Sequence, residues 1–401
     1  MTTTTATSTG TPLPPKLQLK SNSVSEFVDL VRAWLDSVTI PAVAVEENER
    51  FTVLRAWQRT LYDAGFMGVD WAVESGGQGL TPQHRLAFMR ELARAHAPAP
   101  IGLIGLDVVG PSIEKYGTPE QRRTLLPSLL SGEEIWCQGF SEPGAGSDLA
   151  SLRTRATLNG DVFRVDGQKV WTSWASRASR CALLCVTDPE AVPHHRGLSY
   201  LLVDMNAPGV AVRPIRQMTG DAEFCEVFFD GVEVPRSQLL GSLNDGWRIA
   251  LDTLSSERGN YAMRRLVEIG WLLEDTIDEL TRSGKRLDAR TDEAIGRAHV
   301  ALAVLESQIA RTTERLTSQT GPDPVDSIDK LVLNEAEQVV CESLVALAGP
   351  FRAAPQSRPF GLRVDRLVHD HVFSRAASIY GGTSQIQRNI VAERLLGLPK
   401  G

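Results

Sequence analysis

A glycine-rich segment from Trp136 to Asp148 holds the residues whose types and spacing best suit ligand binding. Its glycines, among them Gly144 and Gly146, predict a loop that Ser147 helps to close. Such a loop presents small residues, backbone N–H groups and hydroxyl groups to an approaching molecule. It could bind a phosphate, or it could simply join a helix to a strand. Because it has neither the P-loop pattern nor the dinucleotide-binding spacing, composition leaves both interpretations open.

A second candidate is the carboxylate of Glu257, which Arg258 follows in a helical pattern. The neighbouring residues Ser255, Ser256 and Gly259 are small and leave room for a ligand. A carboxylate beside a ligand can act as a general base. On residue types alone, however, a solvated Glu–Arg pair on a helix face is the favoured interpretation.

Histidines and cysteines give weaker signals. The odd number of cysteines, five, fits buried or reduced thiols better than a disulfide framework. Cys181 and Cys185 share one face of a strand-like run, and nothing completes a zinc site, so we expect no metal. His194-His195 occupies a polar loop, and His369-Asp370-His371 has a strand-like spacing, so both are interpreted as structural.

Four segments, in order and at the expected spacing, resemble motifs of one protein family. They are Gly139–Asp148, Gln168–Ser173, Phe228–Pro235 and Ile379–Arg388. On these motifs the chain is identified as a member of the acyl-CoA dehydrogenase family of flavoproteins, with the likeness extending over roughly residues 25–398. One such motif would carry little weight, whereas four in order are specific.

The resemblance implies an α+β fold with three parts. These are an N-terminal helical domain (24–135), a middle antiparallel β-domain (136–240) and a C-terminal helical bundle (241–401). The residue patterns agree, because helical periodicity fills the first and last thirds while short β-type runs with Asn-Gly and Asp-Gly turns fill the middle. Residues 1–23, which are rich in Thr, Ser and Pro, are expected to form a disordered tail.

Members of this family bind FAD between the β-domain and the C-terminal bundle, with an acyl thioester on the flavin face. A carboxylate removes the α-proton while the β-hydride passes to flavin N5. The resemblance places Trp171 against the flavin ring, Ser173 near N5 and Ser147 near the carrier end of the substrate. The full set of predicted cofactor residues is Gln138, Phe140, Ser141, Gly146, Ser147, Trp171, Thr172, Ser173, Thr383 and Gln385.

The position of the base distinguishes subsets of the family. Many members carry Glu directly after the Tyr of the C-terminal turn, but here that residue is Gly381, which cannot accept a proton. The isovaleryl and long-chain enzymes instead supply the base from a Glu-Arg pair after a Gly-aromatic pair. Here Glu257 follows Gly246 by eleven residues and matches that register. We therefore predict Glu257 as the catalytic base.

The predicted substrate residues are Ser147, Arg258, Gly381 and Gly382. Because Gly381-Gly382 replaces a carboxylate arm, the site is expected to have volume for a branched or bulky acyl group. The resemblance also implies that the carrier is CoA or a carrier protein, and that the electron acceptor is an electron-transfer flavoprotein or another acceptor.

Two departures from the family pattern concern assembly. The region Leu280–Arg297 lacks the expected Arg-x-x-Phe-Gly stretch, and Leu347–Phe351 replaces a glycine-rich loop, so the FAD diphosphate contacts differ. Some actinobacterial-type relatives share such losses and assemble from two unlike subunits. We therefore expect a homo-oligomer (dimer or tetramer) or a heteromer with a related subunit. Two alternatives stay open: a flavin-dependent monooxygenase, and a non-catalytic subunit that completes a partner's site.

Composition sets outer limits. The 401 residues exceed what one core usually organises, and 42% apolar and 23% charged residues are ordinary for a globular chain. A net charge of −7 gives no basic surface for nucleic acid, and no apolar run has the length of a membrane span. We therefore expect a cytoplasmic enzyme with no nucleic-acid or membrane partner.

Overall fold

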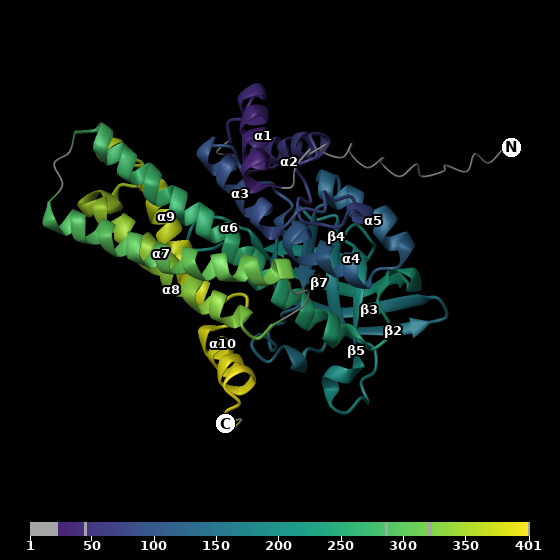
Figure 1. Cartoon of the computed structure of the whole chain (residues 1–401). Helices are drawn as coiled ribbons and strands as arrows, with labels where there is room; N and C mark the ends of the chain where they lie inside the picture. The colour runs from purple at the N-terminus through teal and green to yellow at the C-terminus, as the bar shows by residue number, and fades with distance from the viewer. Residues whose placement is uncertain (1–22, 44–45, 285–287, 319–322, 400–401) are drawn as a thin grey trace.

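The computed structural model of the chain describes residues 23–43, 46–284, 288–318 and 323–399 (Figure 1). Nearly all of the tail predicted at 1–23 therefore lies outside the described residues. Helices come first, a sheet follows, and long helices complete the chain, as the sequence predicts. The three boundaries at 24, 136 and 241 stay predictions.

Five α-helices lie in the described N-terminal part of the chain, and a side chain caps the first turn of several of them. In α1 the side chain of Ser23 caps the first turn by accepting a hydrogen bond from the backbone N–H of Glu26 at 3.2 Å. Its predicted apolar stripe is confirmed, since Phe27, Val31 and Leu35 are buried. The helices are α1 (Val24–Ser37), α2 (Glu47–Asp63), α3 (Pro82–Arg94), α4 (Gly110–Tyr116) and α5 (Pro119–Ser131).

The sheet has eight strands in the order β6-β7-β3-β2-β4-β5-β8, and β1 pairs with β4. Residues alternate between its faces: Leu184 and Leu202 pack with the N-terminal helices, whereas Leu183 and Leu201 join the core on the opposite face. The strands are β1 (Trp136–Gly139), β2 (Arg155–Asn159), β3 (Val162–Ser173), β4 (Arg180–Val186), β5 (Leu198–Asp204), β6 (Val210–Pro214), β7 (Phe224–Pro235) and β8 (Leu239–Leu240).

The prediction of a purely antiparallel sheet is wrong at β4. β1 runs parallel to β4 over its whole length, and β2 meets β4 in the parallel sense at Arg155 and Val186. Turn signals such as Asn159-Gly160 report only on consecutive strands, and that hairpin does form between β2 and β3. Parallel partners are separated by long connections, so local sequence carries no signal of them.

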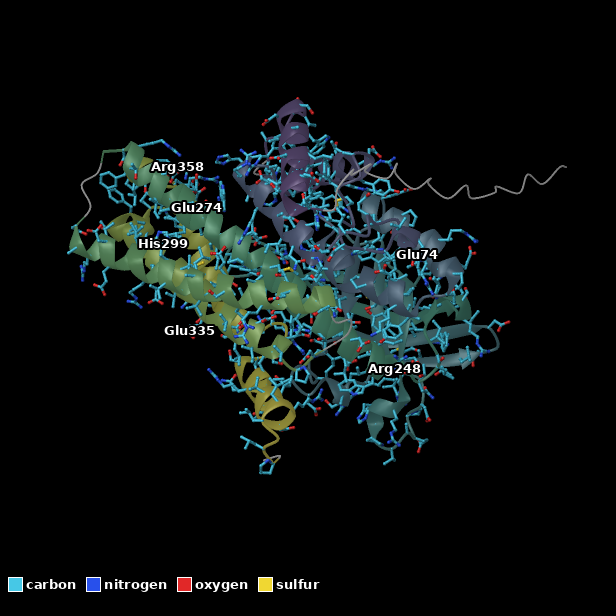
Figure 2. All side chains as sticks on the ribbon, in the orientation of Figure 1. Glu74, Arg248, Glu274, His299, Glu335 and Arg358 are labelled. Atoms are coloured by element: carbon cyan, nitrogen blue, oxygen red, sulfur yellow. The ribbon has the colours of Figure 1, made fainter. Side chains whose placement is uncertain are left out.

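Long helices form the C-terminal part, with α6 lying against α8 and α7 against α8 (Figure 1). Polar and charged side chains such as Glu274, His299 and Glu335 are exposed on this part of the molecule (Figure 2). Apolar residues fill the space between the helices. The helices are α6 (Gly246–Arg282), α7 (Ala289–Ser318), α8 (Asp326–Leu347), α9 (Val364–Ser374) and α10 (Ser384–Ile390).

One local prediction in this part is also wrong. The segment His369-Asp370-His371, expected to be strand-like, lies within helix α9. Two histidines separated by one residue fit either a strand or a helix, because a three-residue pattern does not distinguish the two periods. His369 instead bridges two parts of the fold, since its Nε2 lies 2.6 Å from a carboxylate oxygen of Asp221 in the segment before β7.

None of the helices in the described part of the chain combines the length and apolar composition that crossing a membrane requires.

Candidate active site

Trp171 stands at an irregular point of strand β3. The register with β7 shifts between Lys169 and Thr172, and Trp171 itself has a φ of 60°. For a bulky residue this left-handed conformation is uncommon, and such strain concentrates at functional sites. The indole is 59% exposed, and the ring of Phe224 lies edge-on to it at 6.1 Å between ring centres. The bulge thus presents an aromatic face to solvent, where a planar ligand could stack.

The glycine-rich segment is fixed directly beside this strand. The backbone N–H of Val170 donates to the carbonyl of Ser141 at 2.9 Å. The ammonium of Lys169, fully buried, donates to the carbonyl of Phe140 and to the carboxylate of Glu142, each at 2.9 Å. The structure therefore brings together two motifs that the sequence separates by about thirty residues. The ring of Phe140 itself is buried against Tyr200, so this residue faces the core.

The remainder of the loop has the features of a cradle. A Cβ added to Gly144 or Gly146 would meet no atom within 4 Å among the described residues, so packing inside this chain does not demand glycine there. Gly146 and Ser147 are exposed. The amide nitrogen of Gln138 and the hydroxyl of Thr172 are buried without a hydrogen-bond partner in the described ranges. Open glycines and unpaired polar atoms fit a bound group such as FAD.

The C-terminal turn begins at Gly381 and Gly382, whose φ angles are 62° and 87°. Their left-handed conformation favours glycine. Thr383 then caps α10, and the amide of Gln387 donates to the carbonyl of Gly381 at 3.0 Å. Gln385 points outward and is exposed. The turn is therefore held rigidly by its own helix.

Glu257, on α6, lies beside this turn. Its Oε1 is 3.7 Å from the place where a Cβ on Gly381 would stand. The two positions from which the family draws its base are thus neighbours in this chain. The other oxygen, Oε2, is buried and accepts no hydrogen bond from any residue the structure describes. Burial raises the pKa of Glu257, although the charges of Arg258 and Lys330 oppose the rise.

Lys330, from α8, supplies a cation under the same turn. It is 2% exposed, and its Nζ donates to the carbonyl of Ala377 at 2.7 Å. The ammonium lies 4.2 Å from the centre of the Tyr380 ring and 5.7 Å from that of Tyr261. Burial lowers the pKa of Lys330 to about 8, while nearby carboxylates partly oppose this effect.

A second carboxylate, Glu337, lies one heptad further along α8 and is fully buried. It accepts a hydrogen bond from Arg265 at 2.6 Å and another from the hydroxyl of Tyr380 at 3.5 Å. The hydroxyl groups of Tyr380 and Tyr261 also form a hydrogen bond. Sequence reasoning missed this network. Only the seven-residue spacing of Lys330 and Glu337 signals a shared helix face, and charges at that spacing are usually solvated.

Other candidates do not converge. His194 reaches the carbonyl of Leu152 at 3.1 Å, and the ring of His195 lies 5.5 Å from that of Trp247. Among the described residues, no group of three or more His, Cys, Asp or Glu side chains is placed to hold a metal ion.

Three family models together match most of the chain. Models of the N-terminal, middle and C-terminal domains of acyl-CoA dehydrogenases match residues 21–133, 137–232 and 244–396. The acyl-CoA dehydrogenase IpdE1 of Mycobacterium tuberculosis is 39% identical over 387 residues, covering 94% of this chain and 98% of the relative.

Two solved structures are also similar. One is titled "Tcur3481-Tcur3483 steroid ACAD", with a TM-score of 0.83 and 29% identity, covering 96% of this chain and 99% of that chain. The other is the ChsE4-ChsE5 complex from Mycobacterium tuberculosis, with a TM-score of 0.76 and 28% identity, covering 96% and 100% of the two chains.

The chain belongs to the acyl-CoA dehydrogenase family. It is an oxidoreductase that acts on acyl-CoA, and its cofactor is FAD. The predicted fold and cofactor are confirmed.

Proposed function

We propose that this protein dehydrogenates an acyl thioester between its α and β carbons and that Glu257 removes the α-proton. The observation that carries the proposal is the unpaired, buried Oε2 of Glu257 beside the Gly381 turn. An unpaired buried carboxylate oxygen costs free energy, and such a group is retained where a reaction uses it.

Each step required of the chain has a candidate. Glu257 accepts the α-proton, and its raised pKa brings it nearer to the acidity of a carbon acid. FAD, when bound, accepts the β-hydride. The exposed face of Trp171, the amide of Gln138 and the nearby Ser141 and Ser173 would hold its ring.

Other predicted residues would contact the carrier end of the substrate and the rest of the cofactor. Gly146 and Ser147 are open to the carrier end of the thioester. Thr383 and Gln385 would contact the cofactor beyond its ring. Arg258, whose Nε is buried without a hydrogen-bond partner in the described part of the chain, would orient the thioester.

The acyl group is proposed to be branched or bulky. A Cβ on Gly381 would make only ordinary contacts, at 3.4 Å from Cε of Lys330 and 3.7 Å from Oε1 of Glu257, so this glycine leaves the volume of a side chain beside the proposed base. The similarity to a structure titled "steroid ACAD" also supports a large substrate. The carrier is proposed to be CoA and the electron acceptor an electron-transfer flavoprotein. Because two of the similar structures are named for pairs of proteins, we propose a related second subunit.

The test is a visible spectrum of the purified protein before and after anaerobic addition of a panel of acyl-CoAs. Bleaching of the flavin by a branched or bulky acyl-CoA is the expected result. Flavin that no thioester bleaches, but that consumes oxygen once reduced chemically in the presence of an amine or aromatic compound, would contradict it in favour of a monooxygenase. Colourless protein that gains flavin only with a second chain would contradict it in favour of a non-catalytic subunit.

A further inference from the structure

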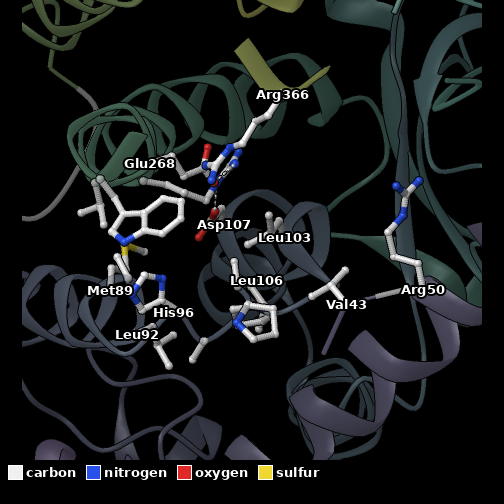
Figure 3. A pocket seen from close by; sticks show the side chains of 18 of the residues that line it. Val43, Arg50, Met89, Leu92, His96, Leu103, Leu106, Asp107, Glu268 and Arg366 are labelled. Carbon is white, nitrogen blue, oxygen red and sulfur yellow. Dashed lines mark hydrogen bonds and ion pairs between the residues drawn. The ribbon is translucent and has the colours of Figure 1, made fainter. Parts of the chain in front are cut away.

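A cavity of about 980 Å³ lies between the N-terminal helices, α6, α9 and the segment before β7. Part of its wall is apolar, with Met89, Leu92 and Leu106 around it (Figure 3). Asp107 and Glu268 lie on another side of the same cavity (Figure 3). Charges in so large a cavity are unexpected if the cavity only receives a hydrocarbon chain, because an unpaired polar group against an apolar ligand is costly.

Asp107, on the π-helical turn Gly105–Val109, is one of the charged residues of this cavity that have a buried atom without a hydrogen-bond partner among the described residues. This residue is 7% exposed, and its Oδ2 lies 3.7 Å from Nε of Arg264. That distance is too long for a hydrogen bond. Both atoms are buried and neither has a hydrogen-bond partner in the ranges that the structure describes. The pair therefore offers one free acceptor and one free donor side by side.

Both residues make further hydrogen bonds besides the long ion pair between these two atoms. The turn that carries Asp107 is held through its backbone, whose carbonyl accepts a hydrogen bond from Asn260 at 2.9 Å. Arg264 is already held by Glu268, its Nη1 donating to the carboxylate at 3.0 Å. The carboxylate of Asp107 and the Nε–H of Arg264 are thus positioned by other contacts and left available.

Arg264, one member of the pair, lies on the same helix as the proposed base, Glu257. Arg264 follows Glu257 by seven residues on α6, which places the two side chains on one helix face about 10 Å apart along the axis. An acyl group that had its α-carbon at Glu257 and ran along α6 would reach the cavity at Arg264, which lines it. The distance suits the far side of a ring-sized acyl group.

We propose that Asp107 and Arg264 form a binding site for a hydroxyl group on the acyl part of the substrate. A hydroxyl donates to Asp107 and accepts from Arg264, and so pairs both free atoms. A ketone at the same place pairs only Arg264, and a hydrocarbon pairs neither. The proposal rests on the dehydrogenase function, since it locates the distal end of that same substrate.

The test uses three CoA thioesters with one carbon skeleton: 3-cyclohexylpropanoyl-CoA and its ring 4-oxo and trans-4-hydroxy derivatives. Their dissociation constants are measured on the FAD-loaded Glu257→Gln variant from the change in the flavin spectrum, so that no turnover is needed. The hydroxy compound is expected to bind about 10–100-fold more tightly than the hydrocarbon, with the oxo compound between them.

Two variants locate the effect. Asp107→Leu in the same background should reduce the preference for the hydroxy compound to about one. Met89→Leu, a change of similar volume in the apolar wall, should leave the preference unchanged. Equal binding of all three thioesters by the unaltered cavity, or a preference that survives Asp107→Leu, would overturn the proposal. Wild-type flavin that none of the three bleaches, nor any other acyl-CoA, would instead contradict the dehydrogenase function.

Discussion

Glu257 and Glu337 stand on facing helices, and both influence the charge of the same buried lysine, Lys330. The two carboxylates differ in how completely they are hydrogen-bonded. Glu337 is paired with Arg265 and Tyr380, whereas Glu257 has an oxygen with no hydrogen bond to any described residue. The difference separates a carboxylate that holds helices together from one that is available to a substrate. Charge alone does not separate them, since both are carboxylates between α6 and α8, but Glu337 is fully buried whereas Glu257 is partly exposed.

The largest expected effect is on the chemistry of Glu257. Glu257→Gln should keep the flavin bound and lower the rate of flavin reduction by acyl-CoA about 10²–10⁴-fold, because a general base is typically worth that factor. Stopped-flow absorbance under anaerobic conditions measures the rate. Glu337→Gln is the matched carboxylate control and should keep most of the rate in the folded fraction. If Glu257→Gln reduced its flavin at nearly the wild-type rate, Glu257 would not be the base.

Moving the carboxylate from position 257 to position 381 tests whether the location of the base, and not its identity as Glu257, sets the rate. In a Glu257→Gly background, Gly381→Glu places a carboxylate on the neighbouring turn, where a Cβ would stand 3.4 Å from Cε of Lys330. The left-handed φ at this position costs roughly 1–2 kcal/mol for a residue other than glycine. We expect at least a tenfold recovery of the rate over Glu257→Gly alone.

The control for the displaced base is Gly381→Ala in the same background. It carries the backbone strain without the carboxylate, and should recover nothing. If the alanine variant matched the glutamate variant, the recovery would come from the shape of the turn and not from a base.

In stability the order of the two variants should be reversed, so that Glu337→Gln has the larger effect. Glu337→Gln removes the partner of a buried arginine and should lower the free energy of unfolding by about 3–5 kcal/mol. Glu257→Gln should leave stability unchanged or raise it, since it neutralises a carboxylate whose buried Oε2 has no hydrogen-bond partner among the described residues. Calorimetric melting of the two flavin-loaded variants gives the comparison. A larger loss of stability in Glu257→Gln than in Glu337→Gln would contradict the structural role of Glu337 and the catalytic role of Glu257.

Much of the fold follows from local sequence, and the reasons are specific. The stripe of Phe27, Val31 and Leu35 predicts α1 because burial repeats with the helical period. The turn at Asn159-Gly160 predicts the β2–β3 hairpin. The pairing of β1 with β4 could not be predicted, because its register is fixed by long-range packing.

The candidate site also contains some residues that the sequence suggests and others that it does not. Glu257 stays a prediction that the family resemblance makes from its register after Gly246, and its nearness to Gly381 appears only once α6 meets the C-terminal turn. Lys330 and Asp107 gave no signal. Each looks like an ordinary surface charge in sequence, and only tertiary packing buries it.

The smallest expected effect concerns the pH dependence of the rate. Lys330 carries a positive charge that opposes the raised pKa of Glu257. Lys330→Met should therefore raise that pKa further, so that the carboxylate stays protonated to higher pH and the acidic limb of the rate profile moves upward in pH. Lys115→Met, which removes an exposed lysine of α4, is the control and should leave the profile in place. A profile that Lys330→Met did not move would show that this lysine has no influence on the base.

The central claim is that the unpaired carboxylate moves the proton, and α-deuterium exchange tests it most directly. The FAD-loaded protein is incubated in D₂O with 3-thiaoctanoyl-CoA, which has an acidic α-carbon but a sulfur in place of the β-carbon, and exchange at the α-carbon is followed by mass spectrometry. Wild type and Glu337→Gln are expected to exchange the α-proton, and Glu257→Gln to exchange it at least a hundredfold more slowly. Exchange at the wild-type rate in Glu257→Gln would contradict the account.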